Sequence, residues 1–286
     1  MHDGLLFGAG YTAEFFAAEW RMKGDFSSIY GTNRRGKMLS GIVPVIFDGQ
    51  RPIIDFRARF MRVAHVLISI PPDAYGDPVL RFHREDLLTL PALKWIGYLS
   101  TTGVYGDYEG VWVDENSLCR TKTERGVARI KAEEAWLAFG EQTGVKVQVF
   151  RLAGIYGPGR NAIEDVRCGV ARRLAKSGQV FSRIHVQDIV RAVDAARLYG
   201  SDAIYNVADD VPCPSHEVVA YAAELLGVVP PPLLDFEQVA DTLSPMTRSF
   251  YAECKRVSNS RIKVLLPEGE WQYPNYRMGL QAFLEG

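Results

Sequence analysis

A phosphate-binding pattern lies at the first junction between a predicted strand and a predicted helix. Gly8, Gly10 and Ala13 follow the opening apolar run. Glycine allows a tight turn and lets a pyrophosphate approach the backbone, and a small third residue lets the helix pack on the strand. Tyr11 and Thr12 would begin the helix. Their N–H groups, at the positive end of the helix dipole, would face the anion. The pattern predicts dinucleotide binding, although a structural turn could have the same spacing.

The residues after the second predicted strand bear on which dinucleotide would bind. Thr32 ends this strand, and Arg34 and Arg35 follow it. NAD sites have an acidic residue here that accepts from the ribose 2′-hydroxyl. A carboxylate would repel a 2′-phosphate, whereas a guanidinium binds one through two hydrogen bonds. The sequence therefore predicts NADP, with NAD as the alternative, and the purely structural explanation is that both arginines are solvated loop charges.

Two further loops are expected beside the same ligand. Asp48 follows the third predicted strand and is placed to reach an adenine. Ser69 and Pro71 follow the fourth strand, where they would border a nicotinamide ribose. Both loops come at the carboxyl ends of strands, which is the edge where open α/β sheets bind ligands. Either loop could also be an ordinary turn.

The elements that must position these residues alternate along the chain. Short apolar runs, typical of strands buried on both faces, are separated by amphipathic helical patterns. This order predicts an α/β protein with a Rossmann-type, doubly wound parallel sheet and right-handed crossovers. The expected strands are residues 4–10, 27–32, 41–48, 64–72, 93–103, 145–154 and 203–209, and the main helices are 12–23, 77–90, 128–142, 189–200 and 216–227.

The pattern changes after residue 208. Residues 1–208 are expected to form the NAD(P)-binding Rossmann domain, with an insertion at about 157–182 that belongs to a substrate lobe. Residues 209–286 contain one good amphipathic helix, which Gly227 ends, followed by short segments with prolines and aromatics. These residues predict a small, mainly helical C-terminal lobe.

Several motifs resemble the extended short-chain dehydrogenase/reductases, a group that includes nucleotide-sugar epimerases and dehydratases. They are the glycine junction, LSTTGVYGD (99–107), FRLAGIYGPGRN (150–161), FSRIHVQDIVRA (181–192) and AIYNVADD (203–210). The resemblance covers most of the chain and implies a Rossmann fold, a nicotinamide cofactor and oxidoreductase or epimerase-like chemistry. It also implies that Arg160, Asn161 and Lys176 lie where such proteins contact a substrate's phosphate or sugar, although they could equally be solvated helix charges.

The resemblance breaks at the catalytic residues. A Ser or Thr precedes the tyrosine of the family's V-Y-G motif by four residues, and Thr101 has this place before Tyr105. The Thr101 hydroxyl would bond a substrate oxygen or cap its own turn. The family's Y-x-x-x-K-x-x-x-E pattern corresponds to Arg125, Arg129 and Glu133. Arginine stays protonated and cannot be the acid and base that tyrosine provides, but it can bind a carboxylate, phosphate or oxyanion; Arg129 could still bind ribose hydroxyls as the lysine does.

Other side chains would have to move the proton if this chain catalyses the family's chemistry. The candidates are Tyr105, Tyr108, Tyr156 and His185. Tyr105 and Tyr156 are expected mainly to pack in their turns, and His185 to be a structural histidine on an apolar strand. Asp188 is expected to cap the helix that follows. The chain therefore resembles the atypical members of the group, which keep the cofactor fold without the usual active-site residues.

Composition limits the other classes of function. Lys and Arg (33) balance Asp and Glu (34), so no overall basic field favours nucleic acid or an anionic membrane. No apolar run approaches the ~20 residues of a membrane span, and no cationic segment typical of a secretory signal precedes the first apolar run. The four cysteines are far apart, without a disulfide or metal-ligand pattern. A cytoplasmic protein without a metal, nucleic-acid or membrane partner is expected.

Two functions remain compatible with these residues. The first is an NADP-dependent oxidoreductase or epimerase-like enzyme for a small polar or anionic substrate, with Thr101 and Arg125 facing the substrate oxygen. The second is a non-catalytic NAD(P)-binding redox sensor or regulatory protein, which the missing Tyr/Lys pair favours. A homodimer and a monomer are equally compatible with the apolar stripe of residues 128–142.

Overall fold

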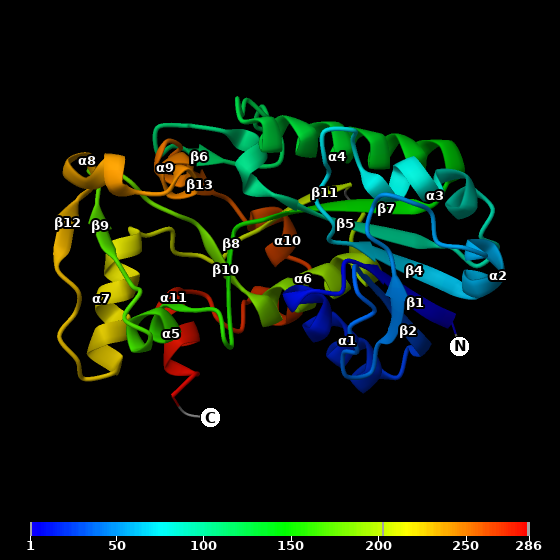
Figure 1. Cartoon of the computed structure of the whole chain (residues 1–286), viewed down its shortest axis with the longest axis horizontal. Coiled ribbons are helices and arrows are strands. Elements are labelled where there is room, and N and C mark those ends of the chain that lie inside the picture. The colour runs from blue at the N-terminus through cyan, green and yellow to red at the C-terminus, as the bar shows by residue number, and fades with distance from the viewer. Residues whose placement is uncertain (1, 202, 285–286) are drawn as a thin grey trace. The chain divides into compact units, whose positions relative to one another are not determined.

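The computed structural model describes residues 2–201 and 203–284, and it contains a seven-stranded central sheet (Figure 1). The strand order is β11-β7-β5-β4-β1-β2-β3. The pairings of β1 with β2 and β4, of β2 with β3 and of β4 with β5 are parallel. The predicted Rossmann-type α/β fold is therefore confirmed. The strands are β1 (His2–Phe7), β2 (Phe26–Asn33), β3 (Val43–Ile46), β4 (Val63–Ile68), β5 (Trp95–Thr101), β7 (Lys146–Leu152) and β11 (Ile204–Val207).

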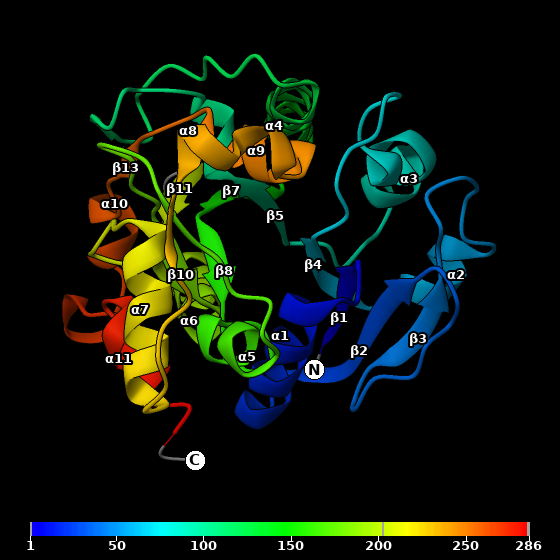
Figure 2. The same cartoon turned by 60° about the vertical axis from the view of Figure 1, so that its left-hand side comes forward.

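Helices cover both faces of this sheet. Figures 1 and 2 show α3 and α4 over one face and α1 with α6 over the other. Local signals set the ends of α4: Thr123 accepts from the N–H of Gly126 at 3.1 Å, and Gly144 ends the helix in the left-handed conformation. The bounds are α1 (Tyr11–Lys23), α2 (Phe56–Phe60), α3 (Pro78–Leu88), α4 (Glu124–Thr143) and α6 (Val186–Tyr199).

The chain forms two compact units, and each is discontinuous in sequence. The first unit is Met1–Thr101, Lys122–Arg151 and Val193–Tyr205, and the second is Thr102–Thr121, Leu152–Ala192 and Asn206–Gly286. The sequence placed only residues 209–286 and an insertion at about 157–182 in the second part. The segments that leave the carboxyl ends of β5 and β7 also belong to the second unit, because they form short strands and turns of their own.

The second unit combines two-stranded parallel sheets with short helices. Figure 2 shows α7 beside α5 and α11. The paired strands are β6 (Trp112–Val113) with β13 (Arg256–Val257), β8 (Gly154–Tyr156) with β10 (Arg183–His185), and β9 (Arg173–Ala175) with β12 (Leu233–Asp235). The helices are α5 (Ala162–Arg167), α7 (Ser215–Leu225), α8 (Phe236–Val239), α9 (Pro245–Tyr251), α10 (Ser260–Lys263) and α11 (Tyr276–Gln281), with 3₁₀ turns η1 (Thr102–Tyr105), η2 (Ala240–Thr242) and η3 (Pro267–Gly269).

None of the helices in residues 2–201 and 203–284 is long and apolar enough to cross a membrane.

Aromatic side chains fill the core of the first unit. The ring of Phe7 in β1 lies 5.6 Å from that of Phe47 and 6.3 Å from that of Phe56, and the buried indole of Trp136 stacks on Tyr98. Burial of each such ring contributes about 1.5–3 kcal/mol, so this packing holds the strand ends that carry the candidate site.

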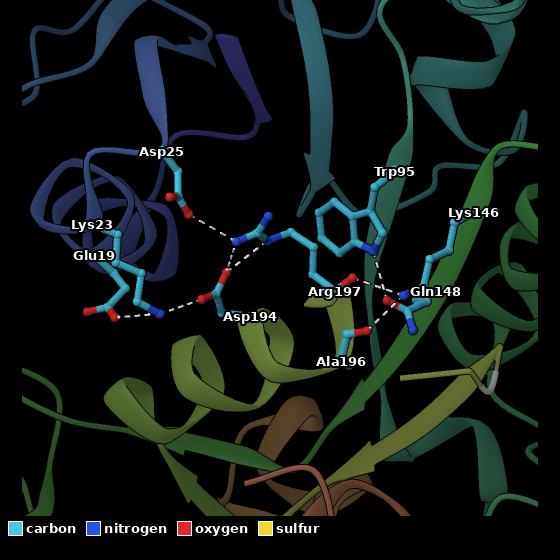
Figure 3. Close-up of polar contacts among 9 residues, drawn as sticks. All are labelled: Glu19, Lys23, Asp25, Trp95, Lys146, Gln148, Asp194, Ala196 and Arg197. Carbon is cyan, nitrogen blue, oxygen red and sulfur yellow. Dashed lines mark hydrogen bonds and ion pairs between the residues drawn. The ribbon is translucent and has the colours of Figure 1, made fainter. Parts of the chain in front are cut away.

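A network of ion pairs joins α1 to α6 at the amino ends of β5 and β7 (Figure 3). The Asp194 side chain is only 2% exposed and accepts from Lys23 of α1 and from Arg197, whose Nη2 is 2.6 Å from Oδ1. Arg197 also reaches Asp25 at 3.3 Å. Lys146 donates to two carbonyls at the end of α6, at 3.1 and 2.9 Å. The network fixes the end of α1 opposite to the glycine turn.

Replacing Asp194 with Asn tests this network. The substitution keeps the side-chain shape but leaves Arg197 and Lys23 without their shared carboxylate, so the free energy of unfolding should fall by about 3 kcal/mol. Asp25→Asn is the matched control, because its side chain is 43% exposed and an exposed pair contributes about 1 kcal/mol at most. Urea unfolding measures both, and equal losses in the two variants would show that burial does not set the strength of this network.

Candidate functional site

The glycine turn is held in place by the two strands beside β1. Gly8 has a φ of +94°, and a Cβ atom there would lie 2.5 Å from the Oγ atom of Ser69. That hydroxyl donates to the carbonyl of Gly8 at 2.7 Å, and the Oγ1 atom of Thr32 accepts from the N–H of Gly8 at 2.9 Å. The structure therefore brings three of the predicted site residues together at the carboxyl edge of the sheet.

Gly10 differs from Gly8, because the fold itself does not require glycine there. Its φ of −113° is open to any residue, and an added Cβ would meet only the carbonyl oxygen of Gly8, at 4.0 Å. Gly10 is the N-cap of α1, and no side chain of the described residues caps this helix. Tyr11 and Thr12 begin the helix, and Ala13 packs against the sheet with 3% exposure. The turn thus leaves room at a helix N-terminus, which matches the needs of a pyrophosphate.

The loop after β2 is a fixed turn that carries two exposed arginines. The Oδ1 atom of Asn33 accepts from the N–H groups of Arg35 at 3.1 Å and Lys37 at 2.8 Å, and its amide donates back to the Lys37 carbonyl at 3.0 Å. Arg34 and Arg35 are both exposed. Thr32, in contrast, is fully buried and bonded to the glycine turn, so it shapes the turn.

Asp48 and Pro71 lie in the loops where the sequence places them. The Oδ1 atom of Asp48 accepts from the N–H of Gln50 at 2.9 Å. This bond, together with the charge of Arg51, holds the pKa of Asp48 below its ordinary value, so the side chain is a carboxylate at neutral pH. Pro71 is exposed in the loop that follows β4. Asp48 already has a role in its own turn, and contact with an adenine stays a prediction.

A buried carboxylate holds α4 against the sheet. Glu133 has a side chain that is 4% exposed, and its Oε2 atom accepts from the Nη2 and Nε atoms of Arg151 in β7, at 2.7 and 3.1 Å. Its Oε1 atom accepts from the hydroxyl of Ser100 in β5. Ser100 directly precedes Thr101, which is half-buried at the end of that strand. Glu133 therefore fixes which face of α4 packs on the sheet, and it fixes the position of the end of β5.

Arg129 lies one helical turn before Glu133 and is bound to the same strand. Its Nη1 atom donates to the carbonyl of Leu99 at 2.6 Å and lies 3.4 Å from the hydroxyl of Tyr98. Burial raises the pKa of Asp77 nearby, an effect that the charge of Arg129 partly offsets. The arginine at the lysine position is thus an anchor between α4 and β5, and contact with ribose hydroxyls stays a prediction.

Arg125 lies one further turn towards the start of α4 and is exposed. Because residues four apart share one face of a helix, Arg125 is on the same face as Arg129 and Glu133. Among the described residues no carboxylate forms an ion pair with Arg125 within 4.0 Å. Its guanidinium is therefore suited to an anionic ligand, and both that role and its place opposite Thr101 stay predictions.

The three tyrosines considered as replacement acids all have structural hydrogen bonds in the second unit. The hydroxyl of Tyr105 is buried and donates to the Oδ1 atom of Asn206 at 2.7 Å. Tyr156 and Tyr108 donate to backbone carbonyls, at 3.4 and 2.8 Å. Burial also raises the pKa of Tyr156 above its ordinary value. The expectation that Tyr105 and Tyr156 pack in their turns is confirmed.

His185 and Asp188 also have structural roles. The His185 ring is buried with its centroid 4.1 Å from that of Tyr273, and burial lowers its pKa to about 4, so it is neutral at pH 7. The expectation that Asp188 caps the following helix is wrong, because α6 begins two residues earlier. Asp188 instead accepts from the N–H groups of Gln272 and Tyr273 at 2.9 and 2.8 Å, which ties α6 to the segment before α11.

The sequence reasoning missed the residues that support the site. Glu133 was matched to the family pattern, but its partner was not foreseen. Arg151 was read as part of an apolar strand, yet a charge inside such a strand needs a buried partner, and that signal could have predicted the Arg151–Glu133 pair. Asn33 precedes the two arginines, and its tendency to bond its own backbone could have predicted the fixed turn. Ser100 carries no signal of its own, because serine is common at strand ends.

Comparison with known proteins places the chain in a family. A model of the NAD dependent epimerase/dehydratase family matches residues 91–208. The structure is also similar to that of a functionally unknown conserved protein from Silicibacter pomeroyi DSS, with 43% identity, coverage of 100% of this chain and 99% of that chain, and a TM-score of 0.86. The chain belongs to the NAD dependent epimerase/dehydratase family. Membership confirms the predicted resemblance to the extended short-chain dehydrogenase/reductases.

More distant solved structures have the same fold. One is dTDP-glucose 4,6-dehydratase from Bacillus anthracis str. Ames in complex with NAD, with 16% identity, coverage of 100% and 96% of the two chains, and a TM-score of 0.76. Another is UDP-glucose 4-epimerase from Thermus thermophilus in complex with NAD, with 19% identity, coverage of 99% of each chain, and a TM-score of 0.72. A comparison with curated proteins gives no match.

The anchoring role of Arg129 in this epimerase/dehydratase family member can be tested against Arg125. Arg129→Ala removes the donor bound to the Leu99 carbonyl, so the free energy of unfolding should fall by about 1–3 kcal/mol. Arg125→Ala lies on the same face of α4 but is exposed and should change stability by about 0.5 kcal/mol at most. Urea unfolding compares them, and a loss in Arg125→Ala as large as that in Arg129→Ala would rule out the anchor.

The buried neutral state of His185 predicts a pH dependence. Burial lowers its pKa from 6.5 to about 4. As pH falls, the histidine of the unfolded chain therefore binds a proton at a higher pH than the histidine of the folded protein does. The free energy of unfolding should therefore decrease as pH falls from 6.5 towards 4. His185→Asn keeps an acceptor for the N–H of Gln187 and should show a smaller decrease in that window, while His65, whose pKa burial also lowers, titrates in both proteins. Urea unfolding across this range measures the difference, and parallel curves would exclude a buried neutral His185.

Proposed function

We propose that this protein binds NADP in its first unit and acts as an oxidoreductase or epimerase-like enzyme on a small polar or anionic substrate. The observation that carries the proposal is Gly10, a residue that leaves room at the N-terminus of α1 without being required by the fold. The proposal also draws on two family structures, a dehydratase and an epimerase, that are described in complex with NAD.

The positive charges after β2 favour NADP over NAD. Gly8, Gly10 and the first residues of α1 would hold the pyrophosphate, while Arg34 and Arg35 would hold the 2′-phosphate. Asn33 supports this assignment, because it fixes the turn that carries both arginines before any ligand binds. A fixed turn loses less conformational entropy on binding than a flexible one, which favours affinity.

The catalytic side of the proposal depends on Thr101 and Arg125. A bound nicotinamide would exchange a hydride with the substrate. The hydroxyl of Thr101 would hydrogen-bond the substrate oxygen, and the permanent charge of Arg125 would stabilise negative charge that develops there. Neither arginine of α4 can give up a proton near neutral pH. Any proton would therefore have to come from the substrate or from water, which distinguishes this site from the tyrosine-dependent sites of the family.

A regulatory NAD(P)-binding protein is the second candidate function. The observation that favours it is the position of Arg129, whose guanidinium is bound to the Leu99 carbonyl. The tyrosines of the second unit are similarly held by their own hydrogen bonds. In this case the bound dinucleotide would set the stability or binding state of the protein without reacting.

Calorimetric titration of NADPH and NADH at moderate salt tests the cofactor. We expect NADPH to bind at least tenfold more tightly, a difference of about 1.4 kcal/mol. The double variant Arg34→Ala/Arg35→Ala should lose this preference and leave NADH binding unchanged, because NADH has no 2′-phosphate. Arg57→Ala, an exposed arginine of α2, is the matched control and should bind both as the wild type does. Binding of neither nucleotide, or equal binding of both, would contradict the proposal.

Turnover separates the enzyme from the regulator. NADPH oxidation should be followed across a panel of carbonyl compounds and nucleotide sugars. An enzyme should oxidise NADPH with at least one anionic or polar member, and Arg125→Ala should then lower kcat/KM, because the variant lacks the proposed charge at the substrate oxygen. Tight NADPH binding without oxidation across the panel would favour the regulator, and unchanged turnover in Arg125→Ala would remove that residue from the mechanism.

A further inference from the structure

A pocket of about 320 Å³ lies in the first unit, at the amino ends of β2 and β3. Its walls come from the last turn of α1, from the first half of β2 and from residues 38–43, which lead into β3. The volume is within the range of about 300–1,000 Å³ that small-molecule sites have. Phe26 lines the pocket, whereas Thr32 near the other end of β2 bonds the glycine turn. At about 3.3 Å per residue, roughly 20 Å of strand separates the pocket from the candidate cofactor site.

Most of the pocket wall is apolar. Phe26, Ile29 and Ile42 line it with buried side chains, and the ring of Phe26 stacks on Trp20 with the ring centroids 4.5 Å apart. Met38 also lines the pocket but is 74% exposed. A methionine side chain adapts its shape to the group that it contacts. The pocket therefore offers a packed apolar surface and an adaptable edge to a ligand with an apolar body.

Arg21 of α1 places a guanidinium in this apolar pocket. Its Nε atom donates to the carbonyl of Ala17 at 3.3 Å, and its Nη1 atom lies against Gly41, where an added Cβ atom would collide with it. Gly41 has a φ of +69°, so glycine suits this turn and leaves the space that the guanidinium occupies. Among the described residues, none that lines the pocket is acidic, and no carboxylate forms an ion pair with Arg21 within 4.0 Å. The positive charge of the pocket is therefore open to an anion.

Two serines of β2 complete the polar lining. The N–H of Ser28 donates to the Oδ1 atom of Asp3 at 3.1 Å, but among the described residues no group bonds the Ser28 hydroxyl. The Oγ atom of Ser27 accepts from Arg62 at 3.3 Å and keeps its own proton for another acceptor. Arg62 also pairs with Asp3 at 3.8 Å, which balances that carboxylate. The pocket thus combines one cation with hydroxyl donors, and this set favours a negatively charged oxygen.

We propose that this pocket binds a small carboxylate ligand with an apolar body. The carboxylate lies at Arg21 and Ser28, and the apolar body packs on Phe26, Ile29 and Ile42. A guanidinium forms its strongest hydrogen bonds with carboxylate and phosphate oxygens. The single charge of a carboxylate matches the single arginine, whereas a phosphate monoester would leave its second charge without a partner. The inference does not rest on NADP binding or on turnover, because no residue of the pocket is among those proposed to hold the nucleotide or the substrate.

Calorimetric titration of the full chain with hexanoate, acetate and hexanol tests the pocket. Hexanoate should bind at least tenfold more tightly than either other probe, because acetate lacks the apolar body and hexanol lacks the charge. Arg21→Gln should weaken hexanoate binding at least tenfold, and Ser28→Phe should abolish it by filling the pocket. Arg57→Gln is the matched control, since this exposed arginine of α2 does not line the pocket; it should bind hexanoate as the wild type does.

Four results would overturn the inference. The first is the absence of any heat of binding with hexanoate at millimolar concentration. Equal binding of hexanol would show that the guanidinium does not contribute. Unchanged binding in Arg21→Gln, an exposed substitution that should not impair folding, would place the ligand elsewhere. Loss of hexanoate binding in Arg34→Ala/Arg35→Ala would place it at the proposed cofactor site. Because NADPH is titrated separately on the same samples, failure of the pocket is distinguishable from failure of the cofactor site.

Discussion

The buried carboxylate of Glu133 is the constraint on which the candidate catalytic site depends. It bonds Arg151 of β7 and Ser100 of β5, so a single side chain of α4 is tied to two strands. A buried charge that loses its partner is strongly destabilising. These bonds fix the rotation of α4 about its own axis. Arg129 and Arg125, which lie one and two turns before Glu133, are on the same face of the helix as Glu133.

The same face of α4 makes a second contact with β5. Arg129 donates to the Leu99 carbonyl, and this bond anchors α4 to the strand end. The cofactor side has separate supports, because Thr32 and Ser69 hold the glycine turn from the two neighbouring strands. Further away, the Asp194 network fixes the other end of α1 (Figure 3). The supports of the glycine turn are therefore separate from those of α4.

Much of the fold could be predicted from the sequence, because the spacing of apolar residues and the turn or capping residues at each end mark its long elements. The apolar strands of the central sheet and the helices α1, α3, α4, α6 and α7 all have such patterns. The two-stranded sheets of the second unit do not, since a strand of two or three residues, such as β6 or β9, is too short to show a period. Their pairing depends on contacts between distant segments. This is also why residues 102–121 could not be assigned to the second unit.

The candidate site could be predicted in its residue types but less so in their roles. The sequence placed Gly8 at a pyrophosphate, Thr32 after the second strand and Ser69 beside a nicotinamide ribose. It has no sign that the side chains of Thr32 and Ser69 bond the glycine turn itself. Arg129 was recognised as unsuited to proton transfer, but its bond to a backbone carbonyl depends on how closely α4 packs on β5. Asp188 was misread because the residues that donate to it, Gln272 and Tyr273, are more than 80 residues away.

A crystal structure of the NADPH complex would test the central claim most directly, through the distance between the Nη1 atom of Arg129 and the Leu99 carbonyl oxygen. We expect that distance to remain near 2.6 Å, with the pyrophosphate at Gly10 and the 2′-phosphate at Arg34 and Arg35. If Arg129 instead leaves the strand and binds the nicotinamide ribose, it has kept the lysine's role. The anchor that we assign to it would then be contradicted.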